Sequence, residues 1–285
     1  MSDTDSAGAK SPHLDSSEQD QAAAHSSPHA LVLHEIIREE GQIALGRTAG
    51  ALAWSSLAAG LSMGFSFLAQ AILRAALPDA PWHHLVDSFG YCIGFVIVIL
   101  GRQQLFTEST LTAVLPVLTD RSLETLGAAC RLWAIVLSVN LIGTWIFAAL
   151  LLTEGTFSAE VTRALQEQSL LVMQGPFEAT VLRAIFAGWL IALMVWLLPS
   201  ARSARLLTVL LITYVVAIGR LSHIIAGSVE GAYAVLSGLA PLADYLFAFM
   251  VPTLIGNIIG GVALVAILNH AAIAPEIQAG SEQEG

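Results

Sequence analysis

The amino-acid sequence predicts an all-α integral membrane protein with six membrane-spanning helices. Of its 285 residues, 55% are hydrophobic and only 12% are charged, and the mean hydropathy is +0.72. A soluble domain has about 25% charged residues, because polar side chains must cover its surface. The chain also contains a series of apolar stretches of the size that crosses a bilayer, about 20 residues. They lie at residues 49–76, 85–118, 128–153, 180–199, 205–238 and 242–270.

The segments outside these stretches are polar or amphipathic. Residues 1–29 are rich in Ser, Asp, Gln and Ala, so we expect a disordered cytoplasmic tail without a signal peptide. Residues 30–47 mix apolar and charged side chains, which predicts an amphipathic cytoplasmic helix on the membrane face or against a neighbouring subunit. A solvated helix is the alternative. Residues 48–270 form the six-span domain, and residues 271–285 form a cytoplasmic C-terminal tail.

The distribution of charge and of cysteine excludes several classes of partner. The formal net charge is −10, and the chain has one lysine, Lys10, and no basic block. Nucleic-acid binding needs clustered cations that neutralise phosphates, so no nucleic-acid partner is expected. Cys92 and Cys130 lie in or beside apolar stretches without metal-ligand spacing, and we interpret them as packing residues. The sequence therefore predicts no metal and no cofactor.

Arginines near the span ends predict the orientation. Short cytoplasmic loops carry an excess of Lys and Arg. With the N-terminus in the cytoplasm, the inner side holds Arg38, Arg47, Arg121, Arg131, Arg202 and Arg205, and the outer side holds Arg74, Arg163 and Arg183. This bias predicts that both termini are cytoplasmic. In a bacterium we then expect the protein in the cytoplasmic (inner) membrane, where the lipid bilayer surrounds its apolar stretches.

The second and fifth apolar stretches are too long for one straight helix, at about 1.5 Å rise per residue. Both contain polar residues halfway along, beside a glycine. These residues are Gly101, Arg102, Gln103 and Gln104 in the second stretch, and Gly219, Arg220, Ser222 and His223 in the fifth. Long, glycine-interrupted segments at matching places in two halves are typical of broken helices that line a central site. Two hydrophobic loops would expose backbone to lipid, which is not tolerated.

The two halves of the chain also share a motif. The third stretch contains Asn140-Leu141-Ile142-Gly143 and the sixth contains Asn257-Ile258-Ile259-Gly260. Because each half has three spans, the second half must be inserted upside down relative to the first. The sequence therefore predicts two inverted three-helix repeats, with Asn140 and Asn257 bracing the two breaks.

Ionisable side chains inside a span are functional candidates, because burying them in lipid is costly. His223 lies at a predicted break and titrates near neutral pH, which suits proton-linked transport; the alternative is a histidine bonded to a backbone carbonyl. Thr107 can cap the half-helix after the first break, and such a helix start favours a small anion. Bulky apolar residues nearby are candidates for narrow gates, although each is also an ordinary packing residue: Leu105, Phe106, Phe95 and Tyr91.

At these positions the chain resembles the formate/nitrite transporter family over about residues 30–270. The shared motifs are Leu105-Phe106-Thr107, Asn140-Leu141-Ile142-Gly143, a His after a Gly in the fifth span, and Pro252-Thr253-Leu254-Ile255-Gly256-Asn257-Ile258-Ile259-Gly260-Gly261. The resemblance is greatest to a bacterial branch with the stretch Arg102 to Glu108. It implies an aquaporin-like protomer, a homopentamer with one pore per subunit, and passage of small monovalent anions such as formate, nitrite or hydrosulfide.

The chain departs from the family pattern in its charges. Typical members have Gly-Phe-Glu-His where this chain has Gly219-Arg220-Leu221-Ser222-His223, and a small residue where Glu108 stands. Gln104 takes a position that is often acidic, and the Lys typical of the fourth span is missing. Inverted repeats bring the two breaks together, so we expect Arg220 to pair with Glu108, with Glu230 as the second choice.

The sequence therefore predicts a channel or transporter for small monovalent anions, and not an enzyme. A neutral-solute channel of the aquaporin class would have Asn-Pro-Ala at both breaks, and neither has it. An intramembrane hydrolase would need Ser228 and His223 to meet, and the chain has no Gly-x-Ser-x-Gly motif. The other alternative is a structural or regulatory membrane protein with an inactive pore. The departures from the family pattern at Arg220 and Glu108 are compatible with this alternative.

Overall fold

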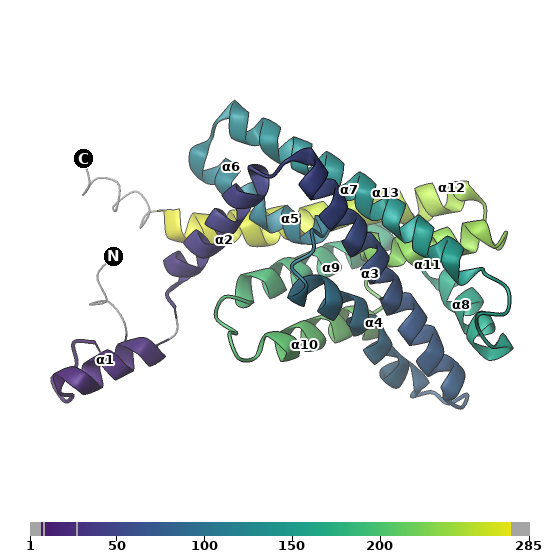
Figure 1. Ribbon diagram of the computed structural model, residues 1–285, viewed down its shortest axis with the longest axis horizontal. Coiled ribbons are helices and arrows are strands. Elements are labelled where there is room, and N and C mark those ends of the chain that lie inside the picture. Colours follow the sequence, from purple (N-terminus) through teal and green to yellow (C-terminus); the bar gives the residue numbers. More distant parts are fainter. Residues whose placement is uncertain (1–6, 8, 27, 275–285) are drawn as a thin grey trace.

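A computed structural model describes residues 7, 9–26 and 28–274, and all regular structure in these residues is helical (Figure 1). The segments η2 and η3 are π-helical and continue directly from the α-helices beside them. In chain order the helices are α1 (Ser16–His25), α2 (Ala30–Leu45), α3 (Ala49–Ala76), α4 (His83–Leu100), α5 (Phe106–Thr112), α6 (Val114–Asp120), α7 (Leu123–Leu151), α8 (Ala159–Leu171), α9 (Phe177–Leu197), α10 (Arg205–Ile218), α11 (Ile224–Leu236), α12 (Leu242–Asp244), η2 (Tyr245–Met250), α13 (Val251–Ile258) and η3 (Ile259–Ile267).

Five of these helical segments are long and apolar enough to cross a bilayer. They are α3, α4, α7, α9 and the continuous helix Leu242–Ala274. Helices α10 and α11 are apolar but have only 14 and 13 residues, so neither alone spans a hydrocarbon core of about 30 Å. The expected membrane class is confirmed: the chain is an all-helical protein with several membrane-spanning helices.

Close backbone contacts join the long helices in two groups. Helix α3 packs against α4 and α7, and α9 packs against α13 and η3. A Cβ atom added at Gly60 in α3 would collide with the carbonyl of Asn140 in α7, and one added at Gly188 in α9 would collide with the carbonyl of Asn257 in α13. Small residues permit such close approach of helices in a membrane. The same glycine–asparagine contact therefore occurs once in each half of the chain.

Helix α8 lies between the third and fourth apolar stretches, where the sequence analysis assigned no element. Ser158 caps it by accepting a hydrogen bond from the backbone N–H of Val161 at 3.4 Å, and a serine at this position favours helix initiation. Ala164 and Leu165 are buried in an apolar cluster with Phe67. This packing fixes α8 beside the end of α3.

The N-terminal segment differs from the expected disorder at α1. Asp15 and Glu18 form a capping box: the N–H of Glu18 donates to Oδ1 of Asp15 at 2.8 Å, and the N–H of Asp15 donates to Oε2 of Glu18 at 2.9 Å. Two helix-start donors are thereby satisfied without burial. Residues 1–6, 8 and 27 of this segment lie outside the described residues. At the other end the last helix continues to Ala274, and the rest of the expected tail, 275–285, also lies outside them.

Helix α2 is amphipathic, as its pattern predicted, and its apolar face is buried. Leu33, Ile37 and Ala44 are at most 9% exposed, and Leu33 and Ile37 pack in one cluster with Leu111 of α5 and Leu115 of α6. The helix lies at the same end of the molecule as the C-terminal end of the last helix, at the left of Figure 1.

Candidate transport pathway

Two short non-helical segments interrupt the apolar stretches at equivalent places. Helix α4 ends at Leu100 and α5 begins at Phe106, while α10 ends at Ile218 and α11 begins at Ile224. Each interruption is thus five residues long, and both lie where the sequence contains a Gly-Arg pair.

The backbone leaves the helix in the same way at both interruptions. The residues after the two glycines, Arg102 and Arg220, are left-handed, with φ of 51° and 47°. The following N–H groups donate six-to-one hydrogen bonds of 3.0 Å each, from Gln103 to Val98 O and from Leu221 to Val216 O. This is the Schellman motif, in which the left-handed position is usually glycine. Here arginine occupies it twice, although the left-handed conformation is strained for residues with a Cβ.

Asn140 of α7 anchors the first interruption with three hydrogen bonds. Its Oδ1 accepts from the N–H of Phe106 at 2.9 Å. Its Nδ2 donates to Ser56 O at 2.7 Å and to Gln104 O at 3.0 Å. The side chain is fully buried, so these bonds have no competition from water. One amide therefore ties α3, α7 and the start of α5 together.

Asn257 of α13 makes the corresponding three bonds at the second interruption. Its Oδ1 accepts from the N–H of Ile224 at 2.9 Å, and its Nδ2 donates to Ala184 O at 2.8 Å and Ser222 O at 2.9 Å. The two asparagines thus satisfy backbone groups that the interruptions would otherwise leave without partners in a low-dielectric interior.

The two interruptions meet at Thr107 and His223. Thr107 Oγ1 lies 2.8 Å from His223 Nε2, and the N–H of Ala226 donates to His223 Nδ1 at 3.2 Å. Because Nδ1 accepts this bond, a neutral imidazole carries its proton on Nε2 and donates it to Thr107. Both side chains are 1% exposed. These two residues, which the sequence analysis selected separately at the two breaks, are in direct contact.

Apolar side chains surround this contact. The ring of Phe95 lies edge-on to that of His223 with centroids 5.0 Å apart, and Tyr91 follows at 5.3 Å from Phe95. Leu105 and Phe106 are 0% and 1% exposed. The predicted gate residues therefore all lie beside the histidine or at the first interruption.

Two cavities approach this layer from opposite ends of α4. The α8-side cavity, of about 370 Å³, is lined by His83 and His84 at the start of α4 and reaches His223. The α2-side cavity, of about 600 Å³, is lined by Leu100 at the end of α4 and by Glu108. A water molecule occupies about 30 Å³ in the liquid, so both cavities are large enough for several water molecules. Four residues that line neither cavity separate them: Phe95, Leu105, Phe106 and Thr107.

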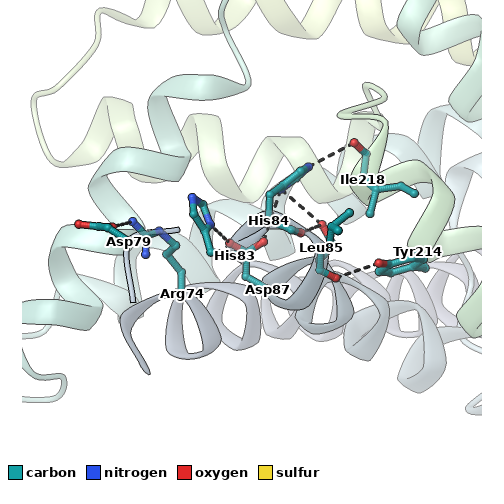
Figure 2. Close-up of polar contacts among 9 residues, drawn as sticks. Arg74, Asp79, His83, His84, Leu85, Asp87, Tyr214 and Ile218 are labelled. Atoms are coloured by element: carbon teal, nitrogen blue, oxygen red, sulfur yellow. Dashed lines mark hydrogen bonds and ion pairs between the residues drawn. The ribbon is translucent and has the colours of Figure 1, made fainter. Parts of the chain in front are cut away.

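The mouth of the α8-side cavity holds a polar cluster, shown in Figure 2. Asp87 is 2% exposed, and its Oδ2 lies 3.0 Å from His83 Nδ1. His84 Nε2 lies 3.2 Å from the carbonyl of Ile218, at the end of α10. Nearby, Arg74 pairs with Asp79, and its guanidinium lowers the pKa of that carboxyl below its ordinary value. The cluster therefore joins the starting turns of α4 to the second interruption.

The expected ion pair between Arg220 and Glu108 is absent, since the structure places them in different cavities. Arg220 lines the α8-side cavity, whereas Glu108 lines the α2-side cavity. Each interruption directs its left-handed arginine to a different cavity, Arg102 to the α2-side cavity and Arg220 to the α8-side cavity. Glu230, the second choice, lines the same cavity as Arg220, but among the described residues no ion pair joins them.

Several cavity residues were not singled out from the sequence. Asp87 and the two histidines before it form the pattern His-His-x-x-Asp at a helix start, whose spacing places His83 and Asp87 on one face. Arg183, named above only among the outer-side arginines, lines the α8-side cavity, and its Nε is buried without a partner. Among the described residues no group of His, Cys, Asp or Glu has a metal-binding arrangement.

Comparison with known proteins decides the family. Residues 32–271 match the family model described as "Formate/nitrite transporter". The chain belongs to the formate/nitrite transporter family. Members of this family are channels and transporters in membranes and not enzymes.

Relatives within the family include two curated bacterial proteins. The chain is 43% identical over 244 residues to the inner membrane protein YfdC of Escherichia coli (strain K12), covering 86% of this chain and 79% of that protein. It is 28% identical over 224 residues to the uncharacterized transporter YrhG of Bacillus subtilis (strain 168), covering 74% and 82%.

Solved structures of family members share the fold. One is a pentameric formate channel with formate bound, with a TM-score of 0.65, 18% identity, and coverage of 79% of this chain and 98% of that one. Another is an FNT family ion channel, with a TM-score of 0.67, 20% identity, and coverage of 85% and 96%.

Proposed function

We propose that this chain is a channel or transporter for small monovalent anions such as formate or nitrite, with one pathway in each protomer. The observation that carries the proposal is the layer between the two cavities, in which a buried Thr107–His223 contact is surrounded by apolar side chains. Polar cavities admit hydrated anions from both ends, and the narrow layer forces them to lose water before crossing.

The membrane topology belongs to the same proposal. Helices α4 and α5 form the second span and α10 and α11 the fifth, each broken at its Gly-Arg pair, so that the chain crosses the membrane six times. The repeated Schellman motifs and the repeated asparagine bonds support two inverted three-helix repeats, because equivalent atoms make equivalent contacts in both halves. Likeness to a pentameric channel supports a homopentamer.

The sidedness follows from charge and from the relatives. The α2-side cavity faces the cytoplasm, together with both termini, and the α8-side cavity faces outside. The excess of arginines on the α2 side and the inner-membrane location of the YfdC relative support this placement in the bacterial cytoplasmic membrane. Residues 48–270 then form the channel domain, with α2 as an amphipathic helix on its cytoplasmic face.

His223 and Thr107 act on the permeating anion at the centre. Desolvation in an apolar layer favours the neutral acid over the anion. His223 supplies a hydrogen-bond donor at Nε2, where Thr107 now accepts, and water in the cavity that reaches His223 supplies the proton. Asn140 and Asn257 hold the two half-helix starts in place, and Leu105, Phe106, Phe95 and Tyr91 exclude water.

A flux screen in proteoliposomes tests the function. The purified full chain is expected to conduct formate or nitrite faster than acetate or chloride, and faster at acidic than at neutral pH. Liposomes prepared without protein are the control for leakage. Absence of flux for all of these anions and for hydrosulfide would identify a pore-inactive membrane protein. Flux of glycerol without flux of any of the anions would identify a neutral-solute channel.

A further inference from the structure

Two arginines occupy left-handed backbone positions where glycine is favoured. Arg102 and Arg220 follow the equivalent glycines of the two interruptions. Arg121 is the other non-glycine residue with positive φ among the described residues, and it ends helix α6 outside the interruptions. A strained position is retained when the side chain contributes something that glycine would not. In both cases the side chain brings a guanidinium to the rim of a cavity.

The two guanidinium groups differ in what they contact. The Nη2 atom of Arg102 lies 2.8 Å from Oε1 of Glu40 in α2. Arg220 has no ion pair with any described residue, and its side chain is exposed in the α8-side cavity. The arginine at the α2-side end of the pathway is therefore paired with a carboxylate, whereas the equivalent arginine at the α8-side end has no ion pair among the described residues.

The carboxylate of Glu40 is the same chemical group as the formate ion. Guanidinium binds carboxylates strongly because its N–H donors match the two oxygens. Glu40 comes from a separate helix, and with Arg102 it lines the α2-side cavity through which an anion must pass. The contact is exposed to solvent, at 73% for Arg102 and 44% for Glu40, so an anion from solution can displace it.

We propose that Arg102 and Arg220 are the anion-capture residues of the two mouths, and that Glu40 is a built-in competitor for the first. This inference rests on the proposed function and deepens it. An anion arriving from the α8 side meets a free guanidinium, whereas one arriving from the α2 side must first displace Glu40. The concentration of formate that half-saturates transport is therefore higher on the α2 side than on the α8 side.

Substitutions on α2 give the test and its control. Glu40→Gln frees Arg102, while Glu39→Gln removes the same charge from the neighbouring, exposed residue that lines neither cavity. Formate uptake is measured in everted and in right-side-out vesicles from cells that express the full chain. Since exposed ion pairs contribute about 0.2–1 kcal/mol, Glu40→Gln should lower the half-saturating formate concentration on the α2 side by a factor of roughly 1.4 to 5.

The remaining variants separate a specific contact from a general charge effect. Glu40→Gln should act on one side of the membrane only, Glu39→Gln on neither, and Arg102→Gln should abolish the effect of Glu40→Gln. Arg220→Gln should raise half-saturation on the α8 side by a similar factor. The proposal would be overturned if Glu40→Gln and Glu39→Gln had equal effects, or if Glu40→Gln shifted half-saturation equally on both sides of the membrane. It would also be overturned if Arg220→Gln left half-saturation on the α8 side unchanged.

A second readout does not depend on transport. Formate, with gluconate as the comparison anion, is titrated against the thermal stability of the purified chain in detergent. The midpoint of the titration should be lower in Glu40→Gln than in Glu39→Gln, and equal midpoints would overturn the capture role. If the wild-type chain transported no anion at all, the proposed function would fail. The titration would still test whether Glu40 competes with formate for Arg102.

Discussion

Thr107 and His223 are 116 positions apart in the chain, yet their side chains form a 2.8 Å hydrogen bond at the centre of the molecule. Each belongs to one of the two helix starts that an asparagine holds in place. The contact therefore depends on both halves of the chain at once, which makes it the natural place to test the pathway.

His223→Phe should change the pH dependence of anion flux while leaving assembly intact. The phenyl ring fills the same space between apolar neighbours but has no proton to give. Flux measured from about pH 5 to 8 should lose its acidic rise, with the elution volume on size-exclusion chromatography unchanged. Thr107→Val, which removes only the hydroxyl, should lower flux about fivefold, the equivalent of one hydrogen bond of about 1 kcal/mol. An unaltered pH profile in His223→Phe would make the histidine a packing residue.

Asn140→Ala and Asn257→Ala should destabilise the protein by similar amounts. Each removes three hydrogen bonds and strands buried backbone groups, at about 1–3 kcal/mol for each group left unsatisfied. Thermal unfolding in detergent should show a large loss for both. Asn269→Ala is the control, because that side chain makes one bond, to Val265 O at 2.9 Å near the end of the last helix. A small effect at Asn140 or Asn257 would contradict the bracing role.

Gly60→Ala and Gly188→Ala should prevent correct folding or assembly. At each position a Cβ would collide with the carbonyl of the asparagine that holds an interruption, so helices would have to separate. Gly127→Ala in α7 is the matched control, since no atom lies within 4 Å of its Cβ position. That substitution should be neutral or stabilising, because alanine favours a helix by about 1 kcal/mol over glycine. A Gly60→Ala variant that folds and assembles like the wild-type chain would contradict the packing.

Glu108→Gln and Arg220→Gln should have additive effects on thermal stability. They line different cavities, and residues without shared contacts add to within about 0.5 kcal/mol. The measurement is a mutant cycle of the two single variants and the double. A double variant more stable than the sum of the singles would show coupling that the structure does not contain.

The contact between α2 and the last helix should weaken in acid. Burial lowers the pKa of His34 below its ordinary value of 6.5, although the carboxyl of Glu35 opposes the shift. His34 Nε2 faces His270 Nδ1 at 3.1 Å, and Arg38 also lies nearby. Because the folded state binds the proton less readily, this stabilisation is present above pH 6.5 and decreases as the pH falls below it. Thermal unfolding from pH 7.5 to 5 should show the loss, and His34→Gln should reduce it.

Much of the fold could be predicted because lipid imposes simple demands on a sequence. The length of the apolar stretches indicated membrane spans, and the repeated Asn-x-Ile-Gly motif pointed to Asn140 and Asn257, which both hold interruptions. Thr107 and His223 could each be selected from their places at the two predicted breaks. Helix α8 was not predicted, because thirteen residues with few apolar side chains give a weak pattern.

The placement of charges could not be predicted from spacing. Arg220 lies in one interruption and Glu108 three residues after the other, which suggested a pair once the two breaks come together, but the direction of a side chain depends on φ at one residue. In Arg102 and Arg220 the left-handed backbone turns each guanidinium toward its own end of the molecule. Glycine is the residue usually found at this left-handed position, so conformational propensity does not predict a functional side chain there.

The asparagine bonds limit how the pathway can open. Asn140 fixes α3 and α7 to the start of α5 through one rigid amide, and Asn257 does the same for α9, α13 and α11. Moving either half-helix start would break three buried hydrogen bonds together. We therefore expect the frame of the proposed pathway to stay fixed, and permeation to depend on rotation of individual side chains such as Phe95 and Leu105, on the timescale of rotamer exchange and not of domain motion.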